Sequence, residues 1–138
     1  MSLSELVSPL IGRWLLAWYF LSQAWALANG WDHTIADIAH RGFPAAPLLL
    51  ALALLAMFLG SLSLILGYQT RFGAMLLFAL VVVTSIAMHD FWLMRGPDQQ
   101  SEYELFARNL AIAGGLLFLV GMGPGRFALD NSGGQKRR

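Results

Sequence analysis

The sequence predicts an all-α membrane protein, folded as an up-and-down bundle of four transmembrane helices with a short interfacial helix in its first loop. Of its 138 residues, 57% are hydrophobic and 12% are charged, and the mean hydropathy is +0.60. Soluble domains carry about 25% charged residues. A water-soluble protein of this length could not bury so many apolar side chains in its core. The composition therefore indicates a chain surrounded by lipid.

Four apolar segments have the length that a membrane requires. They span residues 9–28, 47–67, 72–88 and 105–122. About 20 residues of helix cross a bilayer core, with a working range of about 17–25. The two middle segments hold no charged residue, whereas Arg13 lies near the start of the first and Arg108 in the opening turns of the fourth. The sequence therefore predicts four membrane-spanning helices.

Short connections between these segments favour an up-and-down bundle, since only residues 68–71 separate the second segment from the third. The first loop contains a further two-turn helix by its pattern. Thr34 followed by Asp37 resembles a capping box, and Gly42 with Pro44 is typical of a helix stop. We expect this helix to lie on the membrane surface. Residues 1–130 form one transmembrane domain, and residues 131–138 are predicted to be a flexible basic tail.

The distribution of Lys and Arg predicts the orientation, because four spans place both termini on one side. That side holds Arg13, Arg71, Arg126, Lys136, Arg137 and Arg138, whereas the other side holds Arg41, Arg95 and Arg108. Cytoplasmic loops carry the excess of positive charge, so both termini are predicted to be cytoplasmic. Net charge +1 without a basic stripe indicates no nucleic-acid partner, and the absence of cysteine excludes thiol chemistry.

A polar cluster is predicted where the third segment ends and the fourth begins. His89 and Asp90 close one helix, Trp92 follows, and Arg108 and Asn109 open the next. Each charge is unfavourable at its own helix end, with Asp90 at the negative end and Arg108 near the positive end. An unpaired charge at the centre of a membrane helix costs about 2.5–3.5 kcal/mol. We therefore expect Asp90 and His89 to meet Arg108 and Asn109.

Three interpretations of this cluster stay open. In the first, the cluster only holds the helix ends at the level of the lipid headgroups. In the second, it forms a pocket for a polar headgroup or a small electron carrier. In the third, His89 forms a metal site with His33 and His40. Three distant histidines are a weak metal signal, so no metal site is predicted. In the first loop, Asp37, His40 and Arg41 are candidates for holding a partner protein.

Four short motifs carry a family resemblance. They are GYQTR at 67–71, HDFW at 89–92, RNLAIAGGLLFL at 108–119 and GPGRFALD at 123–130. Their order and spacing resemble the DoxX family of small bacterial membrane proteins. The resemblance implies four transmembrane helices and a bacterial inner-membrane location. Some members are associated with thiosulfate:quinone oxidoreductase and others with membrane oxidoreductase complexes.

Two positions depart from the family pattern. Many relatives have Ser-Gly-x-x-Lys in the first helix, where this chain has Gln23 and Ala26 after Ser22, and many carry a Glu in the second helix, where this chain has Met57. Both members of a buried Lys–Glu pair are absent together, which leaves no unpaired buried charge.

The resemblance implies a small membrane subunit associated with quinone-linked oxidoreductase activity. The sequence has no cofactor motif of its own, so we do not expect it to be catalytic alone. In this hypothesis His89 and Arg108 hydrogen-bond a quinone carbonyl, Asp90 orients them and Trp92 packs on the ring. The alternative is a non-enzymatic membrane anchor or adaptor, whose loops hold a partner protein or a second copy. A small-solute carrier is less favoured because no broken helix or inverted repeat is evident.

Overall fold

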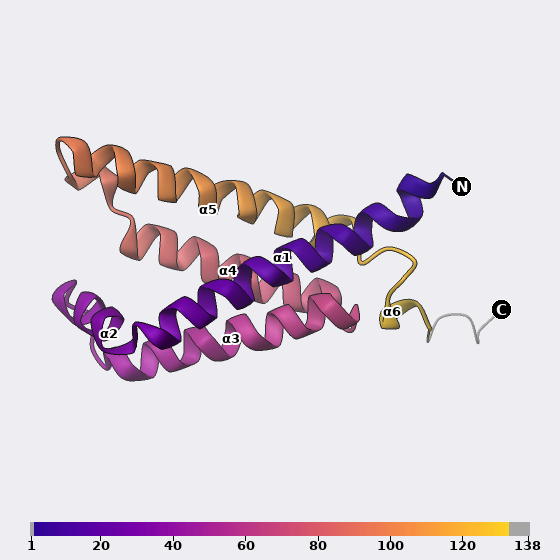
Figure 1. Ribbon diagram of the computed structural model, residues 1–138, viewed down its shortest axis with the longest axis horizontal. Coiled ribbons are helices and arrows are strands. Elements are labelled where there is room, and N and C mark those ends of the chain that lie inside the picture. The colour runs from indigo at the N-terminus through magenta and orange to yellow at the C-terminus, as the bar shows by residue number, and fades with distance from the viewer. Residues whose placement is uncertain (1, 133–138) are drawn as a thin grey trace.

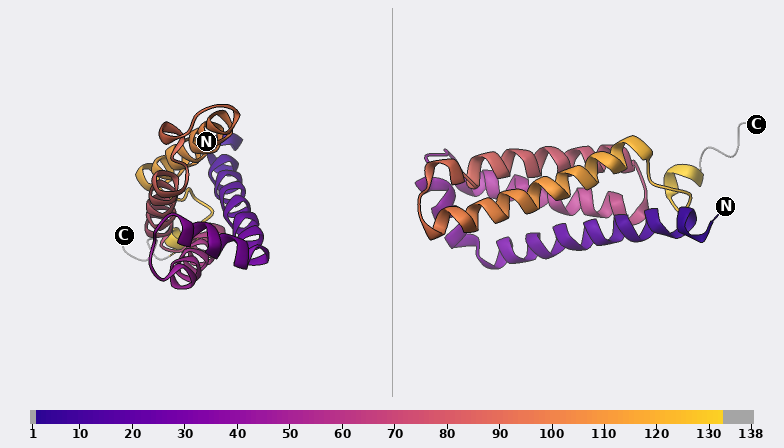
Figure 2. Two further views of the ribbon diagram at one scale, coloured as in Figure 1. Left: turned by 90° about the vertical axis from the view of Figure 1, so that its left-hand side faces the viewer. Right: turned by 90° about the horizontal axis from the view of Figure 1, so that it is seen from above.

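The structure is a computed structural model that describes residues 2–132, and it is all-helical over that part of the chain (Figure 1). Its elements are α1 (Leu3–Asn29), α2 (Trp31–His40), α3 (Ala46–Leu66), α4 (Thr70–Met88), the 3-10 turn η1 (Phe91–Leu93), α5 (Pro97–Met122) and α6 (Leu129–Ser132). The four long helices α1, α3, α4 and α5 run lengthwise along the molecule, as Figure 2 shows from above. The predicted all-helical class is confirmed.

The long helices surround one apolar core. α4 packs against α5 and α3, α1 packs against α3, and α2 lies against α3 and α1. The core residues are Ala17, Phe20, Leu64, Ala74, Leu77, Val81, Ala113, Leu116 and Leu119. A Cβ at Gly60 would lie 2.5 Å from Cγ of Leu77, so glycine permits the close approach of α3 and α4. Apolar side chains gain little free energy when they move from lipid into a helix interface. Membrane helices therefore associate through close packing, which small residues permit.

Three helical stretches are long and apolar enough to cross a membrane, judged by length and composition. They are Ala46–Leu66, Thr70–Leu93 and Pro97–Met122. Large apolar side chains such as Leu52, Phe72 and Phe118 point outward from them. Among the described residues 2–132, α1 does not meet the same criterion. The structure therefore supports three of the four predicted spans on this criterion.

Three predicted boundaries were wrong. α1 begins at Leu3 instead of residue 9, because Ser2 and Glu5 form a capping box there. The helix of the first loop begins at Trp31, and the Thr34 hydroxyl donates to the Gly30 carbonyl within the first turn instead of capping a later start. α5 begins at Pro97, two turns before residue 105, because proline is favoured in the first turn and the polar residues 97–104 continue the helix. Of the predicted tail, residues 133–138 lie outside the described part of the chain.

Candidate functional site

Asp90 and Arg41 form an ion pair at one end of the bundle. We call this end, formed by α2, η1 and the first turns of α5, the loop end. Arg41 Nη1 donates to Asp90 Oδ1 at 2.9 Å, and the two side chains are 27% and 26% exposed. The predicted meeting of Asp90 with Arg108 is thus wrong. Arg41 follows α2 directly, so it reaches the end of α4 and ties the first loop to it.

His89 pairs with a residue that the sequence reasoning missed. Its Nδ1 lies 2.8 Å from Glu102 Oε2, and both side chains are about three-quarters buried, with 21% and 23% exposed. Glu102 lies on the two turns of α5 that precede residue 105, where the fourth span was predicted to begin. Residues seven apart share a helix face, so Glu102 stands on the same face as Asn109. A correct helix start at Pro97 would have revealed this alignment.

Arg108 and Asn109 meet α1 instead of α4. The Tyr19 hydroxyl donates to Asn109 Oδ1 at 3.4 Å, and the Arg108 guanidinium carbon lies 5.9 Å from the Tyr19 ring centroid. Asn109 is buried, whereas Arg108 is exposed. Within residues 2–132, no carboxylate forms an ion pair with Arg108. Its guanidinium therefore keeps its hydrogen-bonding capacity.

Trp92 belongs to an aromatic cluster that fastens η1 to α5. The Phe91 ring lies 5.3 Å from Trp92, 5.2 Å from Tyr103 and 5.2 Å from Phe106, centroid to centroid. Trp92 also packs edge-on against Phe106 at 6.3 Å. Offset and edge-on aromatic pairs of this kind add stability beyond the area they bury. Trp92 thus packs on Phe91 of η1 and Phe106 of α5, while half of its surface stays exposed.

The predicted partner-binding residues separate into two groups. Arg41 forms its ion pair with Asp90, whereas Asp37 and His40 remain exposed on α2. Asp37 pairs with His33 one turn earlier, at 3.4 Å, and both side chains are well exposed. Among the residues that the structure describes, no group of three or more His, Asp or Glu side chains is arranged to hold a metal ion.

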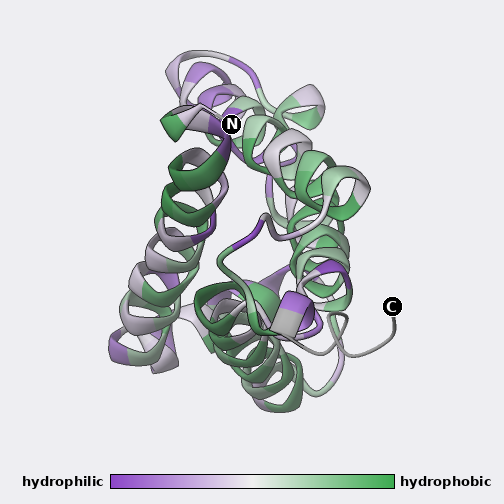
Figure 3. Ribbon diagram, turned by 90° about the vertical axis from the view of Figure 1, so that its right-hand side faces the viewer, coloured by the Kyte–Doolittle hydropathy of each residue, from purple (hydrophilic) through white to green (hydrophobic). Residues whose placement is uncertain are grey.

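A second polar assembly lies at the opposite end of the bundle. We call this the terminal end; it comprises Arg13, the corner 67–70 and the segment 123–130. Figure 3 looks onto it and shows the chain after α5 crossing the end of the bundle. The Asp130 carboxylate accepts from the backbone N–H of Gln69 at 2.6 Å and of Thr70 at 2.9 Å. In return the Asp130 N–H donates to the Gly67 carbonyl at 2.8 Å.

Asp130 thus caps α4 from far along the chain. The first N–H groups of a helix have no partner within it, and Gln69 makes no side-chain cap. Partial desolvation raises the pKa of Asp130, but the hydrogen bonds from Thr70 and Gln69 and the charge of Arg13 outweigh it, so its pKa lies below the ordinary value. The carboxylate is therefore the form that holds this end together.

Arg13 is buried at the same place. It is 1% exposed, and its Nη2 donates to the Phe127 carbonyl. Gly67 adopts φ +67°, and a Cβ there would lie 2.1 Å from Arg13 Nη1. Only glycine adopts this left-handed conformation without strain and leaves room for the Arg13 side chain. Two of the four motifs that carry the family resemblance, GYQTR and GPGRFALD, therefore meet Arg13 of α1 at the terminal end.

Comparisons with known proteins identify the family. The DoxX family model matches residues 8–90, and the SURF4 family model matches residues 61–137. Inner membrane protein YqjF of Escherichia coli K12 is 29% identical over 91% of this chain and 92% of its own length. Inner membrane protein YphA of the same organism is 29% identical over 88% of this chain and 86% of its own length.

A more distant likeness covers only part of the relative. A surfeit locus protein 4 homolog of Schizosaccharomyces pombe is 34% identical over 48% of this chain, which is 22% of that protein. No solved structure matches. The DoxX model covers more than half of the sequence, and the SURF4 model matches from residue 61 onward, so the chain belongs to the DoxX family and its later part also fits the SURF4 family.

Proposed function

We propose that the protein crosses the bacterial inner membrane four times, with α1 as the fourth span and both termini in the cytoplasm. α1 has 27 residues, about 40 Å of helix, against a bilayer core of about 30 Å. It packs along α3 and buries Ala17 and Phe20 in the common core. The names of the two Escherichia coli relatives support the inner-membrane location. The excess of Lys and Arg in the parts of the sequence predicted on the side of both termini supports their cytoplasmic placement.

In the same proposal α2 lies on the outer membrane surface. Its apolar Ile35 and Ile38 are half-buried, whereas Asp32, Asp37 and His40 are exposed. An amphipathic helix of this kind rests in the interface with its polar face toward water. The ion pair of Arg41 with Asp90 holds its end at the level where α4 stops.

We infer further that the protein is a small membrane subunit associated with quinone-linked oxidoreductase activity, and that Arg108 and Asn109 bind the quinone headgroup. The observation that carries this is the unpaired guanidinium of Arg108. It lies about 4.5 Å inside the apolar part of α5, which begins at Leu105. An unpaired charge in an apolar membrane environment is costly, so charged side chains there usually bind another charged or polar group. A carbonyl oxygen of a bound ligand supplies one, and the choice of a quinone rests on the family.

The surrounding residues have supporting roles in this proposal. Tyr19 holds Asn109 and lies under the Arg108 guanidinium. The pair of His89 and Glu102 stands where the site meets the outer surface, and a histidine beside a carboxylate can exchange protons with water. Asp90 positions the first loop through Arg41. The chain supplies binding and proton exchange, and electron transfer belongs to the quinone and to a partner enzyme.

The experiment measures binding of a short-chain ubiquinone analogue to the protein in lipid nanodiscs. Arg108→Gln removes a charge-assisted hydrogen bond, which contributes about 1.5–3 kcal/mol, so affinity is expected to fall about 10- to 100-fold. Arg95→Gln, an exposed arginine in the loop before α5, is the matched control and leaves affinity unchanged. Equal affinity of both variants and the unaltered protein, or no binding to any, overturns the quinone site.

A second candidate function, membrane anchor or adaptor, is favoured by α1. Trp18 and Trp25 lie two turns apart on one exposed face, and Trp18 is 69% exposed in the middle of the helix. A tryptophan N–H usually finds an acceptor, which lipid chains do not offer. A partner helix would cover this face. Trp18→Ala would then abolish co-purification of a partner chain, while Arg108→Gln would preserve it.

A further inference from the structure

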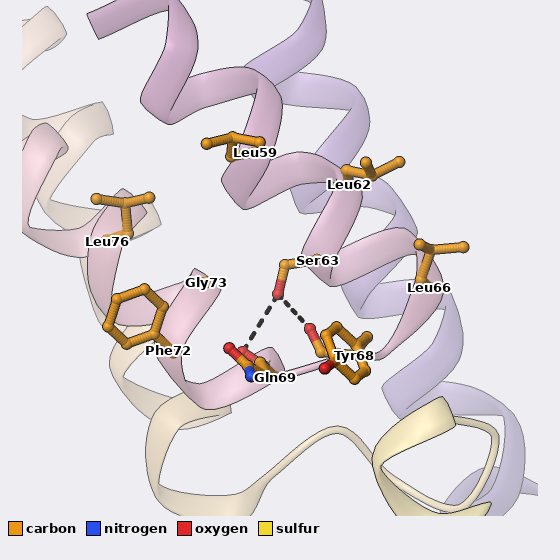
Figure 4. A pocket seen from close by; sticks show the side chains of 9 residues that line it. All are labelled: Leu59, Leu62, Ser63, Leu66, Tyr68, Gln69, Phe72, Gly73 and Leu76. Carbon is orange, nitrogen blue, oxygen red and sulfur yellow. Dashed lines mark hydrogen bonds between the residues drawn. The ribbon is translucent and has the colours of Figure 1, made fainter. Parts of the chain in front are cut away.

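We propose that a groove between α3 and α4, beside the corner at the terminal end, binds one acyl chain of a phospholipid. The groove is open on one side and has a volume of about 220 Å³. Figure 4 shows the side chains that line it. Its walls are aliphatic and aromatic: Leu59, Leu62 and Leu66 come from α3, and Phe72 and Leu76 from α4. It lies at the opposite end of the bundle from Arg108, so it is independent of the proposed quinone site.

The floor of the groove is formed by two small residues. A Cβ at Gly73 would lie 2.2 Å from the Ser63 hydroxyl oxygen, so the absence of a side chain at this position lets the two helices meet. The Ser63 hydroxyl points to the corner and donates to the carbonyls of Tyr68 at 2.7 Å and Gln69 at 3.2 Å. The serine is thereby engaged with the backbone, and what remains facing outward is apolar. The groove therefore suits an aliphatic chain and not a polar ligand.

Two observations identify the occupant as a lipid chain. First, α3 and α4 are both long and apolar enough to cross a membrane, and Leu62 and Phe72 on the two walls are exposed, so the groove opens toward the acyl region. Second, its corner end carries the phenol of Tyr68 and the amide of Gln69. In residues 2–132, neither side-chain group has a hydrogen-bond partner among those that the structure gives.

The polar end and the apolar slot together match one phospholipid. Tyrosine side chains gather at the level where acyl chains join their headgroups. With the corner at that level, the Tyr68 hydroxyl and the Gln69 amide can donate to ester or phosphate oxygens, while the chain follows the groove toward Leu59. An isolated aliphatic molecule would leave these donors unused. The geometry thus fixes the direction of the lipid, with its headgroup at the terminal end.

Native mass spectrometry tests this proposal on the protein released from nanodiscs of phosphatidylethanolamine and phosphatidylglycerol. One phospholipid is expected to stay bound at collision energies that strip all others. Leu62→Trp fills the groove and lowers the lipid-bound fraction about tenfold. Leu55→Trp, on the same helix two turns away and exposed, is the matched control and retains the lipid.

The polar end is tested by Gln69→Asn. Gln69 adopts φ +47°, which asparagine tolerates, so this variant shortens the amide without straining the corner. Loss of one neutral hydrogen bond lowers lipid retention about three- to tenfold. Three results overturn the proposal. The first is that no lipid is retained, and the second is that an isoprenoid molecule is retained in place of a phospholipid. The third is equal lipid retention by Leu62→Trp and Leu55→Trp, because equal retention indicates ordinary boundary lipid. A failed quinone experiment leaves all these outcomes unaffected.

Discussion

The two ends of the bundle are held together by different kinds of bond. At the terminal end, the side chains of Asp130, Arg13 and Ser63 bind backbone groups, and the corner at Gly67 and Gln69 is left-handed. At the loop end, side chains bind side chains, and the pairs are about one-quarter exposed. The first arrangement depends on exact backbone conformation. The second depends on charge, so we expect it to weaken as salt is raised.

The largest effect is expected from Gly67→Ala at the terminal end. A left-handed conformation costs a non-glycine residue about 1–2 kcal/mol, and overpacking against Arg13 adds about 1–3 kcal/mol. The midpoint of thermal unfolding in detergent should therefore fall sharply, or the protein should fail to fold. Gly114→Ala is the control, since nothing lies within 4 Å of a Cβ there and alanine favours helix. Equal midpoints for the two variants would show that the corner tolerates rearrangement.

An intermediate effect is expected from Asp130→Asn, which removes the charge from the cap of α4. Loss of a helix cap costs about 0.5–2 kcal/mol. Because folding lowers the pKa of Asp130, its stabilisation is fully present above about pH 4 and is lost as pH falls through the lowered folded value. The unfolding midpoint of the unaltered protein should approach that of Asp130→Asn on acidification. A constant difference between the two proteins at all pH values would contradict this assignment.

The smallest effect is expected at the loop end, from the pair of Arg41 and Asp90. A double-mutant cycle with Arg41→Gln and Asp90→Asn should give a coupling free energy of about 0.2–1 kcal/mol, because both side chains are partly exposed. The coupling should shrink as salt is raised from about 0.01 to 1 M, over which the Debye length falls from about 30 to 3 Å. If the coupling is large and independent of salt, the pair is shielded and the contrast between the two ends is smaller than proposed.

The helices were largely predictable from the sequence, and their polar ends were not. The predicted segments 47–67 and 72–88 agree closely with α3 at Ala46–Leu66 and α4 at Thr70–Met88. Both are apolar runs bounded by a glycine corner, which is a strong local signal. The start of α5 was misplaced because residues 98–104 are mostly polar and follow the Gly96-Pro97 pair. Apolar periodicity gives no signal for a polar helix that projects beyond the membrane.

Partners within the candidate site could not be derived from helix positions alone. Depth along the bundle was enough to place Asp90 and Arg108 near one end. Which side chains meet depends also on the rotation of each helix about its axis, and on loops that bring Arg41 and Glu102 into reach. At the terminal end, Asp130 was noted only as the last residue of a motif, because a cap supplied from sixty residues away has no local signature.

The sequence by itself determined the all-helical class, the apolar helices and the family, because these depend on composition, local periodicity and motif order. The tertiary structure decided that Arg41 and not Arg108 pairs with Asp90, that Glu102 pairs with His89, and that Arg108 faces α1. It also decided that the GYQTR and GPGRFALD motifs meet around Gly67. The physical reason is that ion pairs and caps form between whichever groups the packing of helices brings within about 3 Å. That packing is set by small residues and core side chains spread over the whole chain.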